Sequence, residues 1–137
     1  MTPEAERRRA ANEATTRAMV VALERADGPA IAALLGDDVV YHFPGRSPVA
    51  GTYRGRDEVM GLFRTLAGRL GGPPKLHSHD VLASEGHAID LAVHSAERNG
   101  VPFEWRAVRV YHFDGGGPIT EIFLTIEDLY GFDSYLE

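Results

Sequence analysis

Apolar residues in the first half of the chain recur every three or four positions, which is the spacing of a helix that buries one face. This pattern predicts helices over Thr2–Ala26, Pro29–Leu35 and Asp57–Leu70. The breaker Asp27-Gly28-Pro29 separates the first two helices, and the run Gly71-Gly72-Pro73-Pro74 ends the third.

Five further segments are rich in β-branched and aromatic residues, and several alternate between apolar and polar positions, which is typical of strands with one buried face. The expected strands are Asp38–Phe43, Leu76–Ala83, His87–Glu97, Val101–Phe113 and Ile119–Ile126. The pair Asn99-Gly100 is a strong signal for a tight hairpin. The segment Pro44–Gly55, with two prolines and three glycines, is expected to be a structured loop.

Helices followed by an antiparallel meander predict an α+β fold in which helices cover one face of a curved sheet. With 137 residues and no linker or repeat, the chain is expected to form a single domain over residues 1–137. Trp105, Arg109 and Tyr111 share one face of the longest strand, together with Phe103 and Phe113. An aromatic concave face of this kind is typical of a scaffold that encloses a small-molecule pocket.

Composition excludes several classes of function. A net charge of −6 argues against a nucleic-acid partner, and the absence of cysteine excludes disulfides and thiolate sites. Met1–Asn12 lacks the apolar stretch of a secretory signal, and no apolar run could cross a bilayer, so we expect a cytoplasmic protein with no membrane partner. His77 and His79 share a strand face without an evident third ligand, and no nucleotide fingerprint occurs, so we expect neither metal nor cofactor.

Particular stretches of the chain match the pattern of a known family. Asp37–Pro48, which contains Tyr41-His42-Phe43-Pro44-Gly45, leads into Ala50–Val59 with its Gly-Arg-Asp helix start. The other matching stretches are His79–Ala83, Ala96–Gly100, Asp114-Gly115 and Ile119–Glu121. Together they resemble the SnoaL-like polyketide cyclase and ketosteroid isomerase-like group of the nuclear transport factor 2-like superfamily. The resemblance implies a cone of three N-terminal helices on a strongly curved antiparallel sheet, and a homodimer formed through the sheet.

The resemblance also points to a candidate base. Ketosteroid isomerases take a proton with an aspartate at the end of the first strand. Counting back from Ala50-Gly51 places that position at His42, whereas counting forward from Asp37-Asp38 places it at Phe43. Only His42 supplies a base near neutral pH. The alternative arrangement turns Tyr41 and Phe43 inward and leaves His42 outside.

Other catalytic positions of the family are altered. The oxyanion tyrosine of the isomerases corresponds to Met19, and their protonated carboxylic acid corresponds to Arg109, so steroid-isomerase chemistry is not expected. The polyketide cyclases use an aspartate near the end of the last strand, where this chain offers Glu127 and Asp128. Asp128 is the better inward candidate because it shares the alternation of the apolar residues in that strand.

Arg109 is the most informative residue without reference to any family. A guanidinium stays charged in a protein and is costly to bury unpaired, so on an aromatic face it needs a partner. That partner is a carboxylate or enolate oxygen of a ligand, where Arg109 would stabilise developing negative charge, or else Asp128 or Glu127. The alternatives to a functional role are a structural ion pair and an edge position with the charged head in water.

The aromatic residues Tyr41, Tyr53, Trp105 and Tyr111 are expected to line the substrate pocket, with plain core packing as the alternative. His87, His94 and His112 are expected to be exposed on the sheet. The face that carries Val108, Val110 and Ala92 is the candidate dimer surface.

From these observations we expect a cofactor-independent enzyme of the isomerase or cyclase type. It would act by acid–base chemistry on a small, largely apolar carbonyl or epoxide compound, such as a polyketide-like intermediate of secondary metabolism. Dehydration and hydrolysis are neighbouring reactions that the same pocket could serve. The alternative is a non-catalytic small-molecule-binding or interaction module of the same fold, which the missing isomerase tyrosine and acid favour.

Overall fold

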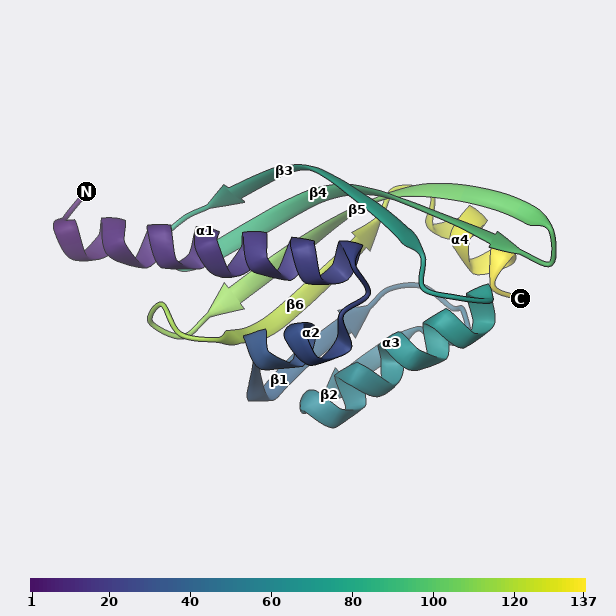
Figure 1. Ribbon diagram of the computed structural model, residues 1–137, viewed down its shortest axis with the longest axis horizontal. Coiled ribbons are helices and arrows are strands. Elements are labelled where there is room, and N and C mark those ends of the chain that lie inside the picture. The colour runs from purple at the N-terminus through teal and green to yellow at the C-terminus, as the bar shows by residue number, and fades with distance from the viewer.

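The computed structural model describes all 137 residues of the chain. Its elements, in chain order, are α1 (Pro3–Glu24), α2 (Gly28–Leu34), β1 (Leu35–Phe43), β2 (Gly51–Arg54), α3 (Arg56–Leu70), β3 (Lys75–Ala83), β4 (His87–Arg98), β5 (Val101–Phe113), β6 (Ile119–Ile126) and α4 (Leu129–Tyr135). Figure 1 shows α1, α2 and α3 on one side of a strongly bent sheet, with α4 near the hairpin between β4 and β5. This is the expected α+β architecture.

The six strands form one sheet in the order β2-β1-β6-β5-β4-β3. All neighbouring pairs are antiparallel except β1 and β6, which run parallel with Tyr41 opposite Ile122. The expectation of a purely antiparallel sheet is wrong at this pair. A parallel pair needs a long connection, and here the connection from β1 to β6 contains five elements, β2, α3, β3, β4 and β5.

Local sequence signals set the helix ends. The hydroxyl of Thr2 accepts a hydrogen bond from the Ala5 amide at 3.0 Å, and Asp27 Oδ1 accepts one from Ala30 at 3.2 Å. Gly71 ends α3 in the left-handed conformation with φ of 75°, which costs glycine nothing. The three predicted helices therefore begin and end within two residues of their expected bounds.

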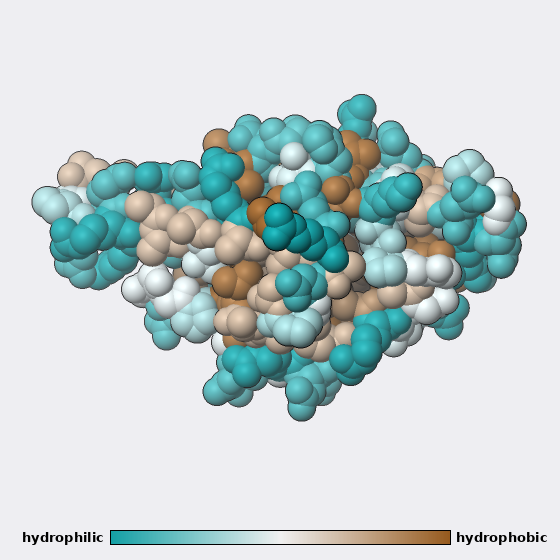
Figure 2. All heavy atoms as spheres, in the orientation of Figure 1, coloured by the Kyte–Doolittle hydropathy of each residue, from teal (hydrophilic) through white to brown (hydrophobic).

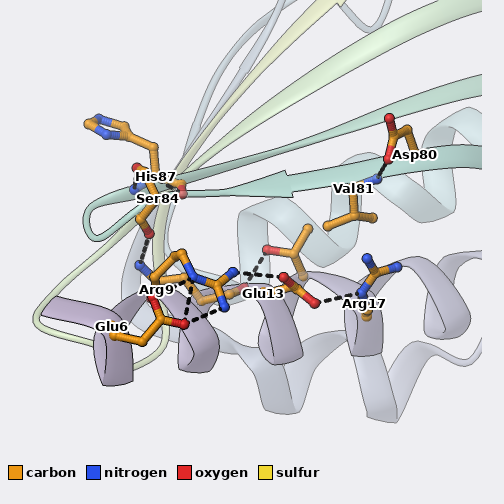
Figure 3. Close-up of polar contacts among 10 residues, drawn as sticks. Glu6, Arg9, Glu13, Arg17, Asp80, Val81, Ser84 and His87 are labelled. Atoms are coloured by element: carbon orange, nitrogen blue, oxygen red, sulfur yellow. Dashed lines mark hydrogen bonds and ion pairs between the residues drawn. The ribbon is translucent and has the colours of Figure 1, made fainter. Parts of the chain in front are cut away.

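The outward side of α1 is a chain of ion pairs. Arg9 contacts Glu6 and Glu13 at 2.8 Å each, and Arg17 contacts Glu13 at 3.2 Å (Figure 3). In Figure 2 hydrophilic side chains cover the projecting N-terminal part of α1, and apolar atoms gather toward the middle of the same face. No helix of the chain combines the length and the apolar composition that crossing a bilayer requires.

Strand alternation divides the sheet into a concave face, which the helices cover, and an outer face. In β5 the buried residues are Trp105, Ala107, Arg109 and Tyr111, as the sequence predicts. In β4 they are Ala88, Asp90, Ala92 and His94.

Two expectations for β4 are wrong. Ala92 belongs to the concave face and not to the proposed dimer surface, and the side chain of His94 is not exposed, since only 3% of that residue is accessible. Both residues occupy even-numbered positions of β4, and the side chains of these positions point toward the concave face. His94 can be buried there because its ring forms a hydrogen bond with Arg109.

Two short elements were not predicted. β2 pairs with β1 inside the segment expected to be a loop, and its four residues offer too little alternation to be recognised. α4 follows Asp128 directly and places Phe132 against the core.

Candidate functional site

A cavity of about 220 Å³ lies between the helices and the concave face. Nineteen residues line it, and thirteen of them are hydrophobic. The apolar wall includes Leu23, Ile31, Met60, Phe63, Trp105 and Phe132. A cavity of about 150 Å³ accommodates benzene, so this one is large enough for a compound somewhat bigger than a single six-membered ring.

One wall of the cavity carries a buried polar cluster supplied by β4 and β5. Asp90 and Arg109 are direct cross-strand partners, and Arg109 Nη1 lies 3.5 Å from Asp90 Oδ1. Arg109 Nη2 donates to His94 Nε2 at 2.7 Å, and the Tyr111 hydroxyl donates to Asp90 Oδ2 at 2.6 Å. Arg109 and His94 line the cavity, whereas Asp90 and Tyr111 lie behind them.

Burial and charge fix the protonation states of this cluster. Burial alone would lower the pKa of Arg109, but the oxygens of Tyr41, Asp90 and Tyr111 outweigh that effect and raise it. Burial, reinforced by the charge of Arg109, lowers the pKa of His94 from 6.5 to about 2. His94 is therefore a neutral imidazole beside a permanent cation.

The neighbour of His94 also fixes its tautomer. A guanidinium can only donate, so the Nε2 atom that Arg109 contacts is an acceptor and the ring proton sits on Nδ1. Nδ1 of His94 and Nε of Arg109 are both buried without a hydrogen-bond partner. The cluster thus holds two N–H donors that no protein acceptor satisfies.

Tyr41 contributes a further polar group to the cavity wall. Burial raises the pKa of its phenol, and the nearby Arg109 guanidinium acts in the opposite direction. The pKa of Tyr111 lies well above its ordinary value, because of burial and then because of the neighbouring Asp90 carboxylate. Both phenols are neutral; the Tyr111 hydroxyl already donates to Asp90, whereas Tyr41 lines the cavity.

Comparison with known protein families shows to which family the chain belongs. The family model of the SnoaL-like domain matches residues 16–122. The chain belongs to the SnoaL-like domain family. No match was found among curated proteins.

Solved structures with the same fold cover nearly all of this SnoaL-like chain. Bal32a from a soil-derived mobile gene cassette is 27% identical, with a TM-score of 0.88 over 95% of this chain and 99% of that one. A nuclear transport factor 2-like protein from Burkholderia xenovorans is 18% identical, with a TM-score of 0.72 over 90% and 95%. An epoxide hydrolase from Mycobacterium tuberculosis, described as LEH-like, is 22% identical, with a TM-score of 0.70 over 96% and 92%.

Of the residues singled out in the sequence, Tyr41, Trp105 and Arg109 line the cavity of this SnoaL-like domain. Tyr111 does not reach the cavity, because its hydroxyl is bound to Asp90 behind the wall. Tyr53 does not reach it either, since its hydroxyl donates to the carbonyl of Val49 at 2.7 Å and holds the turn between β1 and β2.

His42 lies on the outer face of the sheet and not in the cavity. Tyr41 and Phe43 point inward, so alternation along β1 turns His42 outward. Its Nε2 atom lies 2.6 Å from Glu121 Oε2, and its ring stacks on Phe123 with centroids 4.2 Å apart. The structure therefore realises the alternative arrangement of this strand.

Asp128 is also outside the cavity. It is exposed and caps α4, with Oδ1 accepting a hydrogen bond from the Gly131 amide at 3.0 Å. Glu127 is exposed as well and lies 4.0 Å from Arg106. The carboxylate that pairs with Arg109 is Asp90 and neither of these two.

Sequence reasoning missed Asp90 and His94, although a signal for Asp90 was present. A two-residue turn at Asn99-Gly100 pairs Arg98 with Val101, and counting away from the turn along both strands pairs Asp90 with Arg109.

No group of three histidine or acidic side chains in the chain lies together in an arrangement that could hold a metal ion.

Proposed function

We propose that the chain is a cofactor-independent enzyme of the isomerase or cyclase type that acts on a small, largely apolar carbonyl or epoxide compound. The observation that carries this proposal is the position of Arg109. It is a permanent cation fixed by Asp90 and His94 at the wall of a mostly apolar cavity. A charge already in place in such a medium stabilises a substrate oxygen that becomes negative in the transition state.

Arg109 and Tyr41 would both stabilise that oxygen, in different ways. Arg109 supplies the positive charge, and the neutral Tyr41 phenol supplies a hydrogen bond from the same wall. Intramolecular ring closure, which is itself an isomerisation, suits this pair. A hydroxyl of the substrate attacks the carbonyl or epoxide carbon, the electron pair of the C–O bond passes to the oxygen, and the proton lost by the hydroxyl neutralises that oxygen within the same molecule. The proposal assigns no proton transfer to His42 or Asp128, since both side chains are engaged outside the cavity.

Epoxides remain in the proposed substrate class for two reasons. Opening an epoxide places negative charge on the ring oxygen, which is the event that Arg109 is positioned to stabilise. One structural neighbour, from Mycobacterium tuberculosis, is itself described as an epoxide hydrolase.

The test is turnover by Arg109 variants against a panel of small cyclic ketones and epoxides. Arg109→Gln is expected to lower turnover by on the order of 10²-fold or more, as loss of an oxyanion donor does. Because this change leaves Asp90 unpaired, the double variant Arg109→Gln with Asp90→Asn is measured beside it. Tyr53→Phe serves as the control outside the cavity. Unchanged turnover in a folded Arg109→Gln protein would overturn the mechanism.

A second candidate function is binding without turnover. It is favoured by one observation, namely that no carboxylate lines the cavity and Asp90 lies behind Arg109. A binding module would retain ketones and epoxides unchanged, with the bound compound recovered intact after long incubation.

We also propose that the chain forms a homodimer through the outer face of its sheet. Val108, Val110 and Leu91 are half-buried there, and 39% of Phe123 is exposed. An apolar surface of this kind is typical of a protein interface. Sedimentation equilibrium of the wild type and of Val110→Lys tests this, since the charge would disrupt the dimer and leave a monomer.

A further inference from the structure

The buried cluster on the cavity wall has no net charge. The positive charge of Arg109 and the negative charge of Asp90 cancel across β4 and β5. His94, Tyr41 and Tyr111 are neutral, because burial opposes the charged form of each side chain. The wall thus offers hydrogen-bond donors without offering an unbalanced cation.

The unsatisfied groups of the cluster are all donors. Nε of Arg109 and Nδ1 of His94 have no acceptor, and both residues line the cavity. A ligand that meets these groups needs an acceptor oxygen. It does not need a negative charge.

We propose that the cavity selects uncharged ligands with an acceptor oxygen, and that Asp90 sets this selectivity by neutralising Arg109. The inference rests on the proposed function and narrows its substrate class to neutral ketones, ethers and epoxides. An anionic ligand carries a full negative charge before it binds and must lose its hydration to enter the apolar cavity, where the Asp90–Arg109 pair offers no net positive charge to balance it. A neutral ligand has no such desolvation cost, and the charge that develops on its oxygen in the transition state meets hydrogen-bond donors already in place.

The other charged residue of the lining does not change this balance. Arg64 reaches the cavity from α3, but the residue is exposed and forms no ion pair in the structure. Water and salt screen a charge in that position far more than they screen the buried pair. An anion at the buried wall would therefore gain little from Arg64.

A matched pair of probes tests the inference. Cyclohexyl methyl ketone and cyclohexanecarboxylate have nearly the same shape and differ in charge at neutral pH. Trp105 is the single tryptophan of the chain, lines the cavity and stacks on His94 with centroids 5.3 Å apart, so its fluorescence reports occupancy. Calorimetry gives both affinities. We expect the ketone to bind at least about tenfold more tightly than the carboxylate.

Asp90→Asn then separates charge from shape. The amide keeps the volume of the carboxylate but leaves Arg109 unbalanced, so the carboxylate probe should gain about tenfold or more and overtake the ketone. Tyr111→Phe is the matched control, because it removes the hydrogen bond to Asp90 without altering any charge. Its preference for the ketone should persist.

The outcomes distinguish this inference from the proposed function. Wild-type protein that binds the carboxylate as tightly as the ketone overturns the inference, and this holds even if Asp90→Asn fails to fold. A folded Asp90→Asn protein that keeps the ketone preference also overturns it. In both cases Arg109-dependent turnover of ketones would leave the proposed function standing. If neither probe changes Trp105 fluorescence or releases heat, both proposals fall together.

Discussion

Asp90 and Arg109 face each other across β4 and β5, with Arg109 Nη1 at 3.5 Å from Asp90 Oδ1, and both residues are more than nine-tenths buried. The pair lies on the concave face, so the helices that enclose the cavity also shield it from water. A buried pair of this kind gives little net stability, because the cost of removing both charges from water offsets their attraction. Its presence at a cavity wall agrees better with a chemical role for Arg109 than with a role in folding.

The first prediction concerns the stability of this pair. Asp90→Ala leaves the Arg109 guanidinium buried without its counterion and should lower the free energy of unfolding by about 3–5 kcal/mol. The double variant Asp90→Leu with Arg109→Met should recover most of that loss, because it removes both charges and keeps the space filled. Urea denaturation measures both. A double variant as unstable as Asp90→Ala would show that the pair stabilises the fold directly.

The second prediction concerns the response of stability to acid. The unfolded chain takes up a proton at His94 below about pH 6.5, whereas the folded chain resists it until about pH 2. Stability is therefore lost as the pH falls below about 6.5, by about 2 kcal/mol from this residue at about pH 5. His94→Gln should lose correspondingly less free energy of unfolding between about pH 7 and about pH 5. Equal losses in the variant and the wild type would contradict a neutral His94.

The third prediction compares two tyrosine hydroxyls. Tyr111→Phe removes a buried hydrogen bond to a carboxylate and should cost about 1.5–3 kcal/mol of unfolding free energy. Tyr53→Phe removes a half-buried hydrogen bond to a carbonyl and should cost only about 0.5–1.5 kcal/mol. Thermal and urea denaturation rank the two. The reverse order would show that Asp90 does not depend on Tyr111.

The fourth prediction concerns His42, which the sequence singles out as a base. Its ring is paired with Glu121 on the outer face, so His42→Gln should retain turnover within about twofold of the wild type. About a third of each side chain is exposed, so the contact is weak and Glu121→Gln should change stability by no more than about 1 kcal/mol. A 10²-fold loss of turnover in His42→Gln would restore the role in catalysis.

Most of the fold could be predicted from the sequence, because strand alternation and turn residues indicate the strands and their hairpins. The face of β5 that holds Trp105 and Arg109 follows from a period of two, and Asn99-Gly100 marks the hairpin that sets its register with β4. The parallel pairing of β1 with β6 could not be read in the same way. It joins segments about eighty residues apart, and no local pattern encodes such a contact.

Only part of the candidate site could be predicted from the sequence. Arg109 stands out because a lone charge on an aromatic face needs an explanation. The choice between His42 and its neighbours Tyr41 and Phe43 depended on a register shift of one residue, which local sequence does not fix. His94 resembled a surface histidine until the structure placed it beside Arg109, because its burial depends on a contact between two strands.

The polarity of a bound carbonyl tests the central claim most directly. Infrared difference spectra of cyclohexyl methyl ketone, labelled with ¹³C at the carbonyl, report how strongly the cavity polarises that bond. Our account predicts a carbonyl frequency in the wild-type complex below that of the ketone in hexane, and a return toward the hexane value in Arg109→Gln. A bound carbonyl that keeps its hexane frequency in the wild type would show that Arg109 does not act on the ligand oxygen.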